Sequence, residues 1–317
     1  MKIVFMGTPA FAVPSLRGLI DQGYQITAVV TQPDRPKGRK RILSPPPVKV
    51  EAEAYGIPVL QPEKLRDPAA IAELAQYAPD LIVTAAYGQI LPKAVLEMPR
   101  YGCINVHGSL LPKYRGAAPI QYALMDGESE TGVTIMYMEE GLDTGDMISS
   151  VRVPIEDEDD TGTLFDKLSE AGAALLLRTV PELLEGRVQV TPQRHEDATY
   201  ARMIKREHER IDWTQSALSI HNLIRALRPW TGAFTTVEGT ALKIWRADKP
   251  QASDSASSSA PGTIIGIYPG AFEVSCGIGA LLVTEVQPAG KTAMPAGEFL
   301  KSGRLRIGDQ LGGEAAH

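Results

Sequence analysis

The feature that most constrains the fold is a regular alternation of short apolar runs and amphipathic segments near the start of the chain. Four apolar runs are typical of buried strands, at residues 2–6, 25–31, 57–60 and 80–85. Three segments have helical periodicity, at residues 11–21, 48–55 and 68–76. Strands joined by single helices are connected by right-handed crossovers, which predicts a parallel, doubly wound α/β sheet. Functional groups in such a fold lie beyond the carboxyl ends of the strands.

Two further strand-like runs follow, at residues 132–138 and 147–153, and the turn-rich segment EEGLDTGD joins them. We expect both to extend the sheet, and an antiparallel addition is one way to do so. A long helical pattern at residues 161–186 then closes this part of the chain. The next residues show little periodicity and mixed charge, which is typical of a linker. The sequence therefore predicts three consecutive parts: a domain over residues 1–188, a linker over 189–205 and a second domain over 206–317.

The pattern changes after the linker, where β-rich runs follow one another without long helices between them. A short helix is predicted at residues 216–225, and strand-like runs cover residues 241–246, 262–267, 271–275 and 280–287. This order is typical of a small β-barrel. The low-complexity stretch QASDSASSSAP, residues 251–261, is predicted to be a mobile loop between two strands.

The composition is that of an ordinary globular protein, with 44% hydrophobic residues and a formal net charge of −6. Residues 1–201 carry 19 Lys and Arg against 27 Asp and Glu, and the remaining residues carry 13 against 11. An acidic average argues against nucleic-acid binding, but the placement of the positive charge matters more. Cys103 and Cys276 have no metal-binding spacing, so we expect reduced thiols.

No apolar run reaches the roughly 18 residues of a membrane-spanning helix. The N-terminal MKIVF run is interrupted by Gly7, Thr8 and Pro9 before it could form the apolar region of a signal peptide. We therefore expect a cytoplasmic protein that does not engage membranes.

One positive segment lies within the acidic part of the chain. Five cations fall within seven residues, with prolines on either side: Arg35, Lys37, Arg39, Lys40 and Arg41. Prolines favour extended backbone, so the sequence predicts an exposed, stiff, positive loop. A basic run taken alone is more often a solvated surface than a binding site.

The segment most informative about chemistry is INVHGSLLPKYRGAAPIQ, residues 104–121. If its first residues close a strand, Asn105 and His107 point to one face, because side chains in a strand alternate. An amide and an imidazole then share the wall of a cleft. The GSLLP turn that follows offers free backbone groups and two apolar side chains, which suit a flat heterocycle with polar edges. Asp143, in the EEGLDTGD turn, is placed to reach the same crevice.

Each of these three residues also has a purely structural interpretation. Asn105 could satisfy a turn, and His107 could be a hydrogen-bonded histidine of the core. An aspartate in a glycine-rich turn, such as Asp143, usually bonds its own backbone. The functional hypothesis therefore depends on the combination of the three.

Three motifs together resemble the folate-dependent formyltransferase family. They are Asn-x-His-x-Ser-Leu-Leu-Pro from Asn105, Arg-Gly-Ala-Ala-Pro from Arg115 and Leu-Asp-Thr-Gly-Asp from Leu142. The resemblance implies a Rossmann-like domain that binds 10-formyltetrahydrofolate, with Asn105, His107 and Asp143 as its catalytic trio. It also implies folate contacts from two segments: Gln89, Ile90 and Leu91 in one, and Ser109, Leu110, Leu111 and Pro112 in the other. No metal is expected, since the histidines form no ligand cluster.

The chemistry of formyl transfer fits these residue types. An amine that attacks a formyl carbon develops negative charge on the formyl oxygen, and the amide of Asn105 and a protonated His107 are suitable donors to it. Asp143 would keep His107 charged and accept the amine proton, directly or through water. The sequence leaves open whether His107 or a water relay returns a proton to the folate nitrogen.

Three segments resemble the members of the family that act on initiator tRNA. They are GTPAF with the basic loop TQPDRPKGRKR, the stretch RIDWTQSALSIHNLIRALRPW at residues 210–230, and QPAGKTAMPAGEFLKSGRL at residues 287–305. The resemblance implies formylation of methionyl initiator tRNA and an OB-type β-barrel as the second domain. Phosphate attraction explains the charge of the loop. In the family, the arginine at the place of Arg39 helps to read the unpaired end of the acceptor stem, and we expect the loop cations to contact tRNA.

Other functions stay open on the sequence. The main one is a formyltransferase for a sugar-nucleotide amine, which would keep the trio and lack the contacts to a polymer. A non-catalytic nucleic-acid binder would leave the pairing of Asn105 and His107 unexplained. A nicotinamide-dependent oxidoreductase is disfavoured, because residues 6–9, Met-Gly-Thr-Pro, lack the Gly-x-Gly-x-x-Gly phosphate turn. We expect a monomer.

Overall fold

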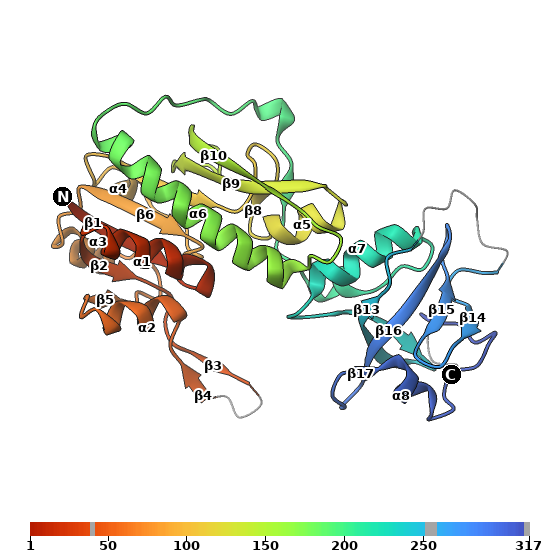
Figure 1. Ribbon diagram of the computed structural model, residues 1–317. Coiled ribbons are helices and arrows are strands. Elements are labelled where there is room, and N and C mark those ends of the chain that lie inside the picture. Colours follow the sequence, from red (N-terminus) through yellow and green to blue (C-terminus); the bar gives the residue numbers. More distant parts are fainter. Residues whose placement is uncertain (39–41, 251–258, 314–317) are drawn as a thin grey trace. The chain divides into compact units, whose positions relative to one another are not determined.

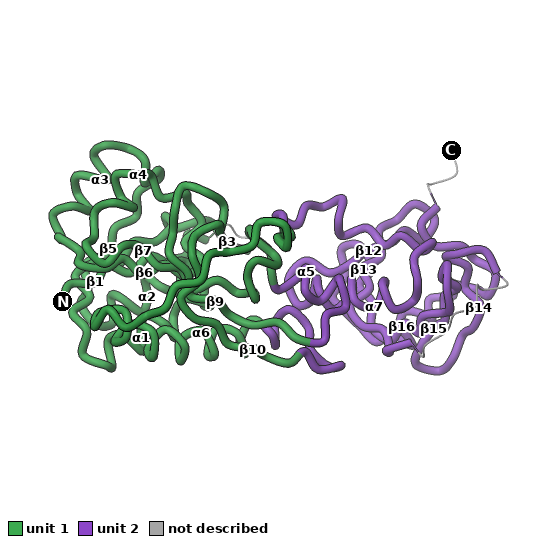
Figure 2. Tube along the Cα trace, turned by 90° about the horizontal axis from the view of Figure 1, so that it is seen from above, with its two compact units in different colours: residues 1–119, 130–154, 165–201 green, residues 120–129, 155–164, 202–317 purple. Residues whose placement is uncertain are grey.

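The computed structural model describes residues 1–38, 42–250 and 259–313, which form two compact units (Figures 1 and 2). Unit 1 comprises residues 1–119, 130–154 and 165–201. Unit 2 comprises residues 120–129, 155–164 and 202–317. The units are therefore interleaved along the chain, whereas the predicted boundaries at residues 188 and 205 treat the domains as consecutive.

A seven-stranded sheet forms the centre of unit 1. Five of its strands are parallel: β1 (Lys2–Gly7), β2 (Gln25–Val30), β5 (Val59–Leu60), β6 (Leu81–Ala85) and β7 (Cys103–His107). Two more extend it in antiparallel fashion: β9 (Glu130–Tyr137) and β10 (Met147–Pro154). The order across the sheet is β10-β9-β7-β6-β1-β2-β5. The chain thus builds outward from β1 in one direction and then in the other, which confirms the predicted doubly wound topology.

Helices cover both faces of this sheet. On one face, α1 (Val13–Asp21) lies beside α6 (Thr161–Leu184) (Figure 1), and Gly172 of α6 comes close to Val106 and Val133 of the sheet. On the other face, α3 (Pro68–Ala75) and α4 (Lys93–Leu96) contribute to an apolar core with β1 and β6. Pro68 opens α3, where a missing N–H costs nothing, and Pro47 does the same for α2 (Pro47–Ala54). In the part of the chain that the structure describes, no helix has both the length and the apolar character needed to cross a bilayer.

Two short ribbons lie outside the main sheet. The predicted basic loop forms a hairpin, in which β3 (Arg35–Lys37) pairs antiparallel with β4 (Ile42–Ser44) (Figure 1). The second ribbon joins β8 (Arg115–Gly116) to β11 (Tyr200–Ala201) in parallel. Residues 200–201 fall within the segment predicted as a linker, so this segment is partly built into unit 1.

Unit 2 is built on an antiparallel sheet. Its main strands are β12 (Ala233–Val237), β13 (Thr240–Ala247), β16 (Ala280–Pro288), β15 (Phe272–Ser275) and β14 (Ile264–Ile267), in that spatial order, and β17 (Met294–Pro295) pairs with β16. The helices α7 (Ala217–Leu227) and α8 (Ala296–Leu300) share one apolar core with these strands. The predicted smaller β domain is confirmed. Residues 251–258 of the predicted mobile loop lie outside the described residues.

Polar contacts explain why residues 155–164 belong to unit 2. Arg228 donates from Nε to Asp160 Oδ2 at 2.8 Å, directly after α7. The hydroxyl of Thr161, at the start of α6, donates to the carbonyl oxygen of Ala226 at 2.6 Å. Lys249, beyond β13, forms an ion pair with Asp157. Asp157 and Asp160 of the acidic run at residues 156–160 therefore attach this segment to unit 2.

Candidate active site

Asn105 is the central residue of β7, which pairs with β6 in the sheet. The hydroxyl of Thr84, its register partner on β6, donates to Asn105 Oδ1 at 2.7 Å. The carboxamide oxygen of Asn105 is thus occupied by a partner within the protein. The two N–H groups of Nδ2 lie on the other side of the carboxamide. Asn105 is half-buried. Because the bond from Thr84 holds its carboxamide, the amide nitrogen is a preoriented donor.

His107 follows two residues later on the same strand and is only 6% exposed. Its Nε2 lies 3.0 Å from the carbonyl oxygen of Tyr114. A carbonyl oxygen only accepts hydrogen bonds, so Nε2 carries a proton in this contact. Nδ1 is therefore the ring nitrogen that gains or loses a proton, and it faces Asp143 Oδ2 at 3.7 Å.

Asp143 lies in the turn between β9 and β10, with a left-handed backbone at φ +51°. Its Oδ2 accepts a hydrogen bond from the backbone N–H of Gly116 at 2.7 Å, so it bonds a distant segment rather than its own turn. Gly116 has φ +120°, and a Cβ there would lie 2.6 Å from the carbonyl oxygen of Ala201. Only glycine fits this position. The Arg-Gly-Ala-Ala-Pro motif thus fixes the carboxylate beside the imidazole.

The structure brings His107 and Asp143 together and places Asn105 on the same face of the same strand as His107. A separation of 3.7 Å exceeds a hydrogen bond but is within ion-pair range once the imidazole is protonated. Catalytic hydrogen bonds often shorten only when substrate binds. A preoriented amide, an imidazole with one fixed proton and a carboxylate can together polarise a carbonyl group and move a proton.

Comparison with known proteins identifies the family of the chain. The formyl transferase family matches residues 1–180, and the C-terminal domain of formyl transferases matches residues 203–304. A methionyl-tRNA formyltransferase of Geobacillus thermodenitrificans is 58% identical over 98% of both chains. One of Halalkalibacterium halodurans is 57% identical over 99% of both chains. The chain belongs to the methionyl-tRNA formyltransferase family.

Solved structures share the fold of this formyltransferase at low identity. HypX from Aquifex aeolicus, in complex with tetrahydrofolic acid, is 19% identical with a TM-score of 0.62, and the match covers 95% of this chain and 47% of that one. This chain therefore spans about half the length of HypX. An N-formyltransferase from Helicobacter canadensis, in complex with folinic acid and dTDP-3-aminofucose, is 18% identical with a TM-score of 0.63, over 89% of this chain and 99% of that one.

The turn after β7 carries four of the predicted folate contacts. Ser109 and Leu111 are buried, and the hydroxyl of Ser109 donates to the carbonyl oxygen of Lys113 at 2.6 Å. Leu110 and Pro112 are partly exposed. The side chains of Leu110 and Pro112 thus keep accessible surface for a ligand. The side chains of Ser109 and Leu111 pack within the turn.

The segment after β6 carries the other three predicted folate contacts. The carboxamide of Gln89 is used within the protein: the N–H of Leu65 donates to Oε1 at 2.7 Å, and Nε2 donates to the carbonyl oxygen of Pro62 at 3.0 Å. Leu91 is 3% exposed and lies in the core. Ile90 is 85% exposed. Ile90 is therefore the member of this group whose side chain is open to a ligand.

The basic hairpin is only partly visible. Arg35 begins β3, and its exposed guanidinium lies 3.2 Å from Glu63 Oε2. The side chain of Lys37 and the whole of Arg39, Lys40 and Arg41 lie outside the described residues. The role of these cations in tRNA binding stays a prediction.

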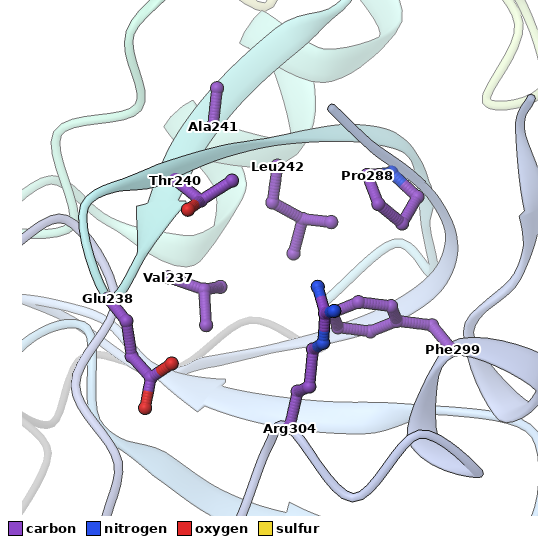
Figure 3. Close-up of a pocket in the computed structure, with 8 residues that line it drawn as sticks. All are labelled: Val237, Glu238, Thr240, Ala241, Leu242, Pro288, Phe299 and Arg304. Carbon is purple, nitrogen blue, oxygen red and sulfur yellow. The ribbon is translucent and has the colours of Figure 1, made fainter. Parts of the chain in front are cut away.

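The pocket in Figure 3 lies within unit 2 and includes no member of the predicted trio. It has a volume of about 70 Å³, an apolar lining that includes Leu242 and Phe299, and two charged residues, Glu238 and Arg304. It holds no imidazole or amide side chain to pair with the carboxylate. We therefore place the candidate active site at the carboxyl edge of the sheet in unit 1.

Three supporting residues escaped the sequence analysis. Thr84 orients Asn105, Tyr114 offers the carbonyl oxygen for His107, and Gly116 holds Asp143. A polar threonine within the apolar strand LIVTA and the glycine of the Arg-Gly-Ala-Ala-Pro motif were the available signals. Tyr114 gave none, because it acts through its backbone.

The cysteines are not part of this site. Burial raises the pKa of both Cys103 and Cys276 to about 12, so neither thiol is a nucleophile near neutral pH. Among residues 1–38, 42–250 and 259–313, no three His, Cys, Asp or Glu side chains are grouped so as to hold a metal ion.

Proposed function

We propose that the protein transfers the formyl group of 10-formyltetrahydrofolate to the α-amino group of methionine esterified to initiator tRNA, in the cytoplasm, and that it acts as a monomer. One observation carries this proposal: the 58% identity with a methionyl-tRNA formyltransferase extends over 98% of both chains. The similarity therefore includes unit 2 and the basic hairpin as well as the fold of the catalytic unit.

In the proposed reaction, the folate substrate supplies an activated formyl carbon, and Asn105 stabilises the charge that develops on the formyl oxygen. Its Nδ2 is the group that donates. Because Thr84 already holds Oδ1 at 2.7 Å, this donor needs little reorganisation when the amine attacks.

His107 and Asp143 manage the proton in this proposal. His107 Nε2 keeps its proton and donates it in a hydrogen bond to the carbonyl oxygen of Tyr114. Protons are therefore exchanged at Nδ1. Asp143, whose Oδ2 lies 3.7 Å from that nitrogen, stabilises the protonated ring and accepts the proton that the attacking amine releases. The folate nitrogen that loses the formyl group takes up a proton in turn, from His107 Nδ1 or through water.

The folate ring is proposed to bind at the same edge of the sheet, between Ile90 and the turn after β7. Ile90 offers an apolar side chain that is 85% exposed, which suits packing on a flat ring. The partly exposed Leu110 and Pro112 extend this apolar surface. A protein of the same fold, HypX, has been solved with tetrahydrofolic acid, which supports a folate substrate.

The tRNA is proposed to contact the β3–β4 hairpin and unit 2. The hairpin carries five cations in seven residues of sequence, and Lys and Arg side chains bind phosphates through charge. The residues of unit 2 from 202 onward carry 13 Lys and Arg against 11 Asp and Glu, in contrast to the acidic remainder of the chain.

The acceptor specificity tests the proposal. Purified protein is incubated with formyl-labelled 10-formyltetrahydrofolate and either methionyl initiator tRNA or an amino-sugar nucleotide such as dTDP-3-aminofucose. Uncharged initiator tRNA, which lacks the amine, is the control. We expect label on the methionyl-tRNA alone. Label on the amino sugar and none on the tRNA would refute the proposal in favour of a sugar-nucleotide formyltransferase.

A further inference from the structure

We propose that Gln193 is a positioning residue for formyl transfer, which holds the turn of Asp143 so that the carboxylate stays beside His107. The inference rests on the proposed function, because it requires that Asp143 take part in the reaction. Gln193 lies in the segment predicted as a linker and is 6% exposed. Neither the sequence motifs nor the comparisons assign it a role.

The contact between Gln193 and the turn is made by its amide nitrogen. Nε2 donates to the carbonyl oxygen of Asp143 at 2.8 Å and to that of Gly145 at 2.7 Å. Both N–H groups are thus used on one short stretch of backbone. This stretch includes the left-handed backbone of Asp143, a conformation that is uncommon outside glycine although aspartate tolerates it better than most residues.

Arg115 determines the orientation of that carboxamide. Its Nε and Nη2 donate to Gln193 Oε1 at 3.0 and 2.8 Å. A guanidinium group only donates, so a flipped carboxamide would place N–H groups against N–H groups. Arg115 is itself 1% exposed, and Nη1 lies 3.3 Å from His195 Nδ1. Buried polar chains of this kind hold their members in one arrangement, because a broken link leaves groups without partners.

Two neighbouring residues therefore hold Asp143 at both ends. Gly116 binds the carboxylate directly through its N–H, and Arg115 fixes the backbone through Gln193. The carboxylate and the backbone of Asp143 are thus both held by residues of the short strand β8. This double attachment explains how a residue in a loop of the chain keeps a defined place next to a residue of the sheet.

Gln193→Glu separates positioning from folding. The new carboxylate keeps an acceptor for Arg115 and gains an ion pair with it, which favours the folded state. It removes both N–H donors to the turn and faces the carbonyl oxygens of Asp143 and Gly145. We expect kcat, measured well below the melting temperature of the variant, to fall roughly 10-fold to 100-fold, as for other groups that orient a catalytic side chain, with KM values close to those of the wild type.

A double-mutant cycle with Asp143→Asn tests whether Gln193 acts through Asp143. If it does, Gln193→Glu lowers kcat by less than about twofold in the Asp143→Asn background, because the group it positions is already disabled. The inference would be overturned if the kcat losses of Gln193→Glu and Asp143→Asn multiply in the double variant. It would also be overturned if Gln193→Glu alone keeps the wild-type kcat. Should Gln193→Glu not fold, Gln193→Asn replaces it, since the shorter amide cannot reach Arg115 and the turn together.

Gln287→Glu is the matched control. In unit 2, Gln287 Oε1 accepts from Trp245 Nε1 at 2.9 Å, and Nε2 donates to the carbonyl oxygen of Lys291 at 2.7 Å. Gln287→Glu therefore removes the same kind of hydrogen bond, from a glutamine amide to a backbone carbonyl, at a place in unit 2. We expect an unchanged kcat at saturating substrate, because Gln287 lies in unit 2 and any loss of tRNA contact there raises the KM for tRNA instead. An equal loss of kcat in both variants would show that the effect is not specific to Asp143 and would overturn the proposal.

Hydrogen exchange supplies a readout that needs no turnover. Gln193→Glu should accelerate amide exchange in residues 139–146 and at Gly116, whose N–H binds the carboxylate, and leave β1 and β6 unchanged. Unchanged exchange in the turn would refute the positioning role whatever acceptor the enzyme uses. If the wild-type enzyme formylates no tRNA and Gln193→Glu still shows the faster exchange, only the proposed function is refuted.

Discussion

At the scale of single residues, the candidate site depends on hydrogen bonds that exist before any substrate binds. Thr84 holds the oxygen of Asn105, and the carbonyl of Tyr114 holds one nitrogen of His107. Each bond determines which atom of the side chain remains for chemistry: Nδ2 in the amide and Nδ1 in the ring. Strand alternation in the sequence predicted that both side chains lie on one face of the strand. It could not predict these partners, because Tyr114 acts through its backbone carbonyl, which every residue has.

Asn105→Ala should lower kcat by about 100-fold to 1,000-fold with little change in the KM for tRNA, because one donor to the developing charge is lost. Steady-state formylation of methionyl-tRNA measures both constants. Asn222, the other asparagine of the chain, is buried on α7 and accepts a hydrogen bond from Arg225 at 3.0 Å. Asn222→Ala should reduce stability and leave kcat near the wild-type value. A loss below about threefold in Asn105→Ala would remove this residue from the trio.

At the scale of elements, β1 and β6 were predictable because they are buried on both faces and form continuous apolar runs. Strand pairs of only two residues could not be predicted. β8 and β11 join residues 115–116 to 200–201, and neither segment has a strand pattern of its own. The same holds for Gln193, whose partners lie about 50 and 80 residues earlier in the chain. Such contacts are set by the tertiary structure rather than by local periodicity.

The β3–β4 hairpin should make binding of tRNA depend on salt. Arg39→Ala should raise the KM for tRNA and reduce the slope of log KM against log salt concentration by about 1, as expected for one lost phosphate contact. Initial rates at several potassium chloride concentrations measure this slope. Arg187→Ala removes an exposed arginine that is paired with Glu185, and it should leave the slope unchanged. A KM that does not depend on salt in the wild type would contradict the role of the hairpin.

His221 on α7 should make the protein less stable in mild acid. Burial, together with the nearby charges of Arg225, Arg228 and Lys249, lowers the pKa of His221 to about 4 from its ordinary 6.5. The unfolded chain therefore takes up this proton first as the pH falls. The stabilisation is complete above pH 6.5 and is lost progressively between about 6.5 and 4.

Urea unfolding of the wild type and of His221→Gln at pH 7.5 and pH 4.5 measures this effect. The wild type should lose on the order of 1–3 kcal/mol more than the variant between the two pH values. The variant serves as the reference for every other group that titrates in this range. Equal losses in both proteins would contradict the lowered pKa.

At the scale of the whole molecule, the sequence predicted two domains of the right kinds but not their interleaving. Residues 155–164 belong to unit 2 through contacts such as Arg228 with Asp160, 68 residues apart. An acidic run has no local property that distinguishes such an attachment from a solvated surface. The candidate site likewise draws on β7 and on a turn 36 residues after His107. The sequence indicated this pairing through the place of the turn after a strand and through the resemblance of the combined motifs.

The most direct test of the account is a single-turnover measurement of formyl transfer to methionyl initiator tRNA, with excess enzyme and rapid quenching. It reports the chemical step in the wild type, in His107→Ala and in Asp143→Asn, free of product release. The account predicts that the rate falls by at least about 100-fold in each variant, while tRNA affinity measured by filter binding stays within a few fold. A single-turnover rate near that of the wild type in either variant would contradict it.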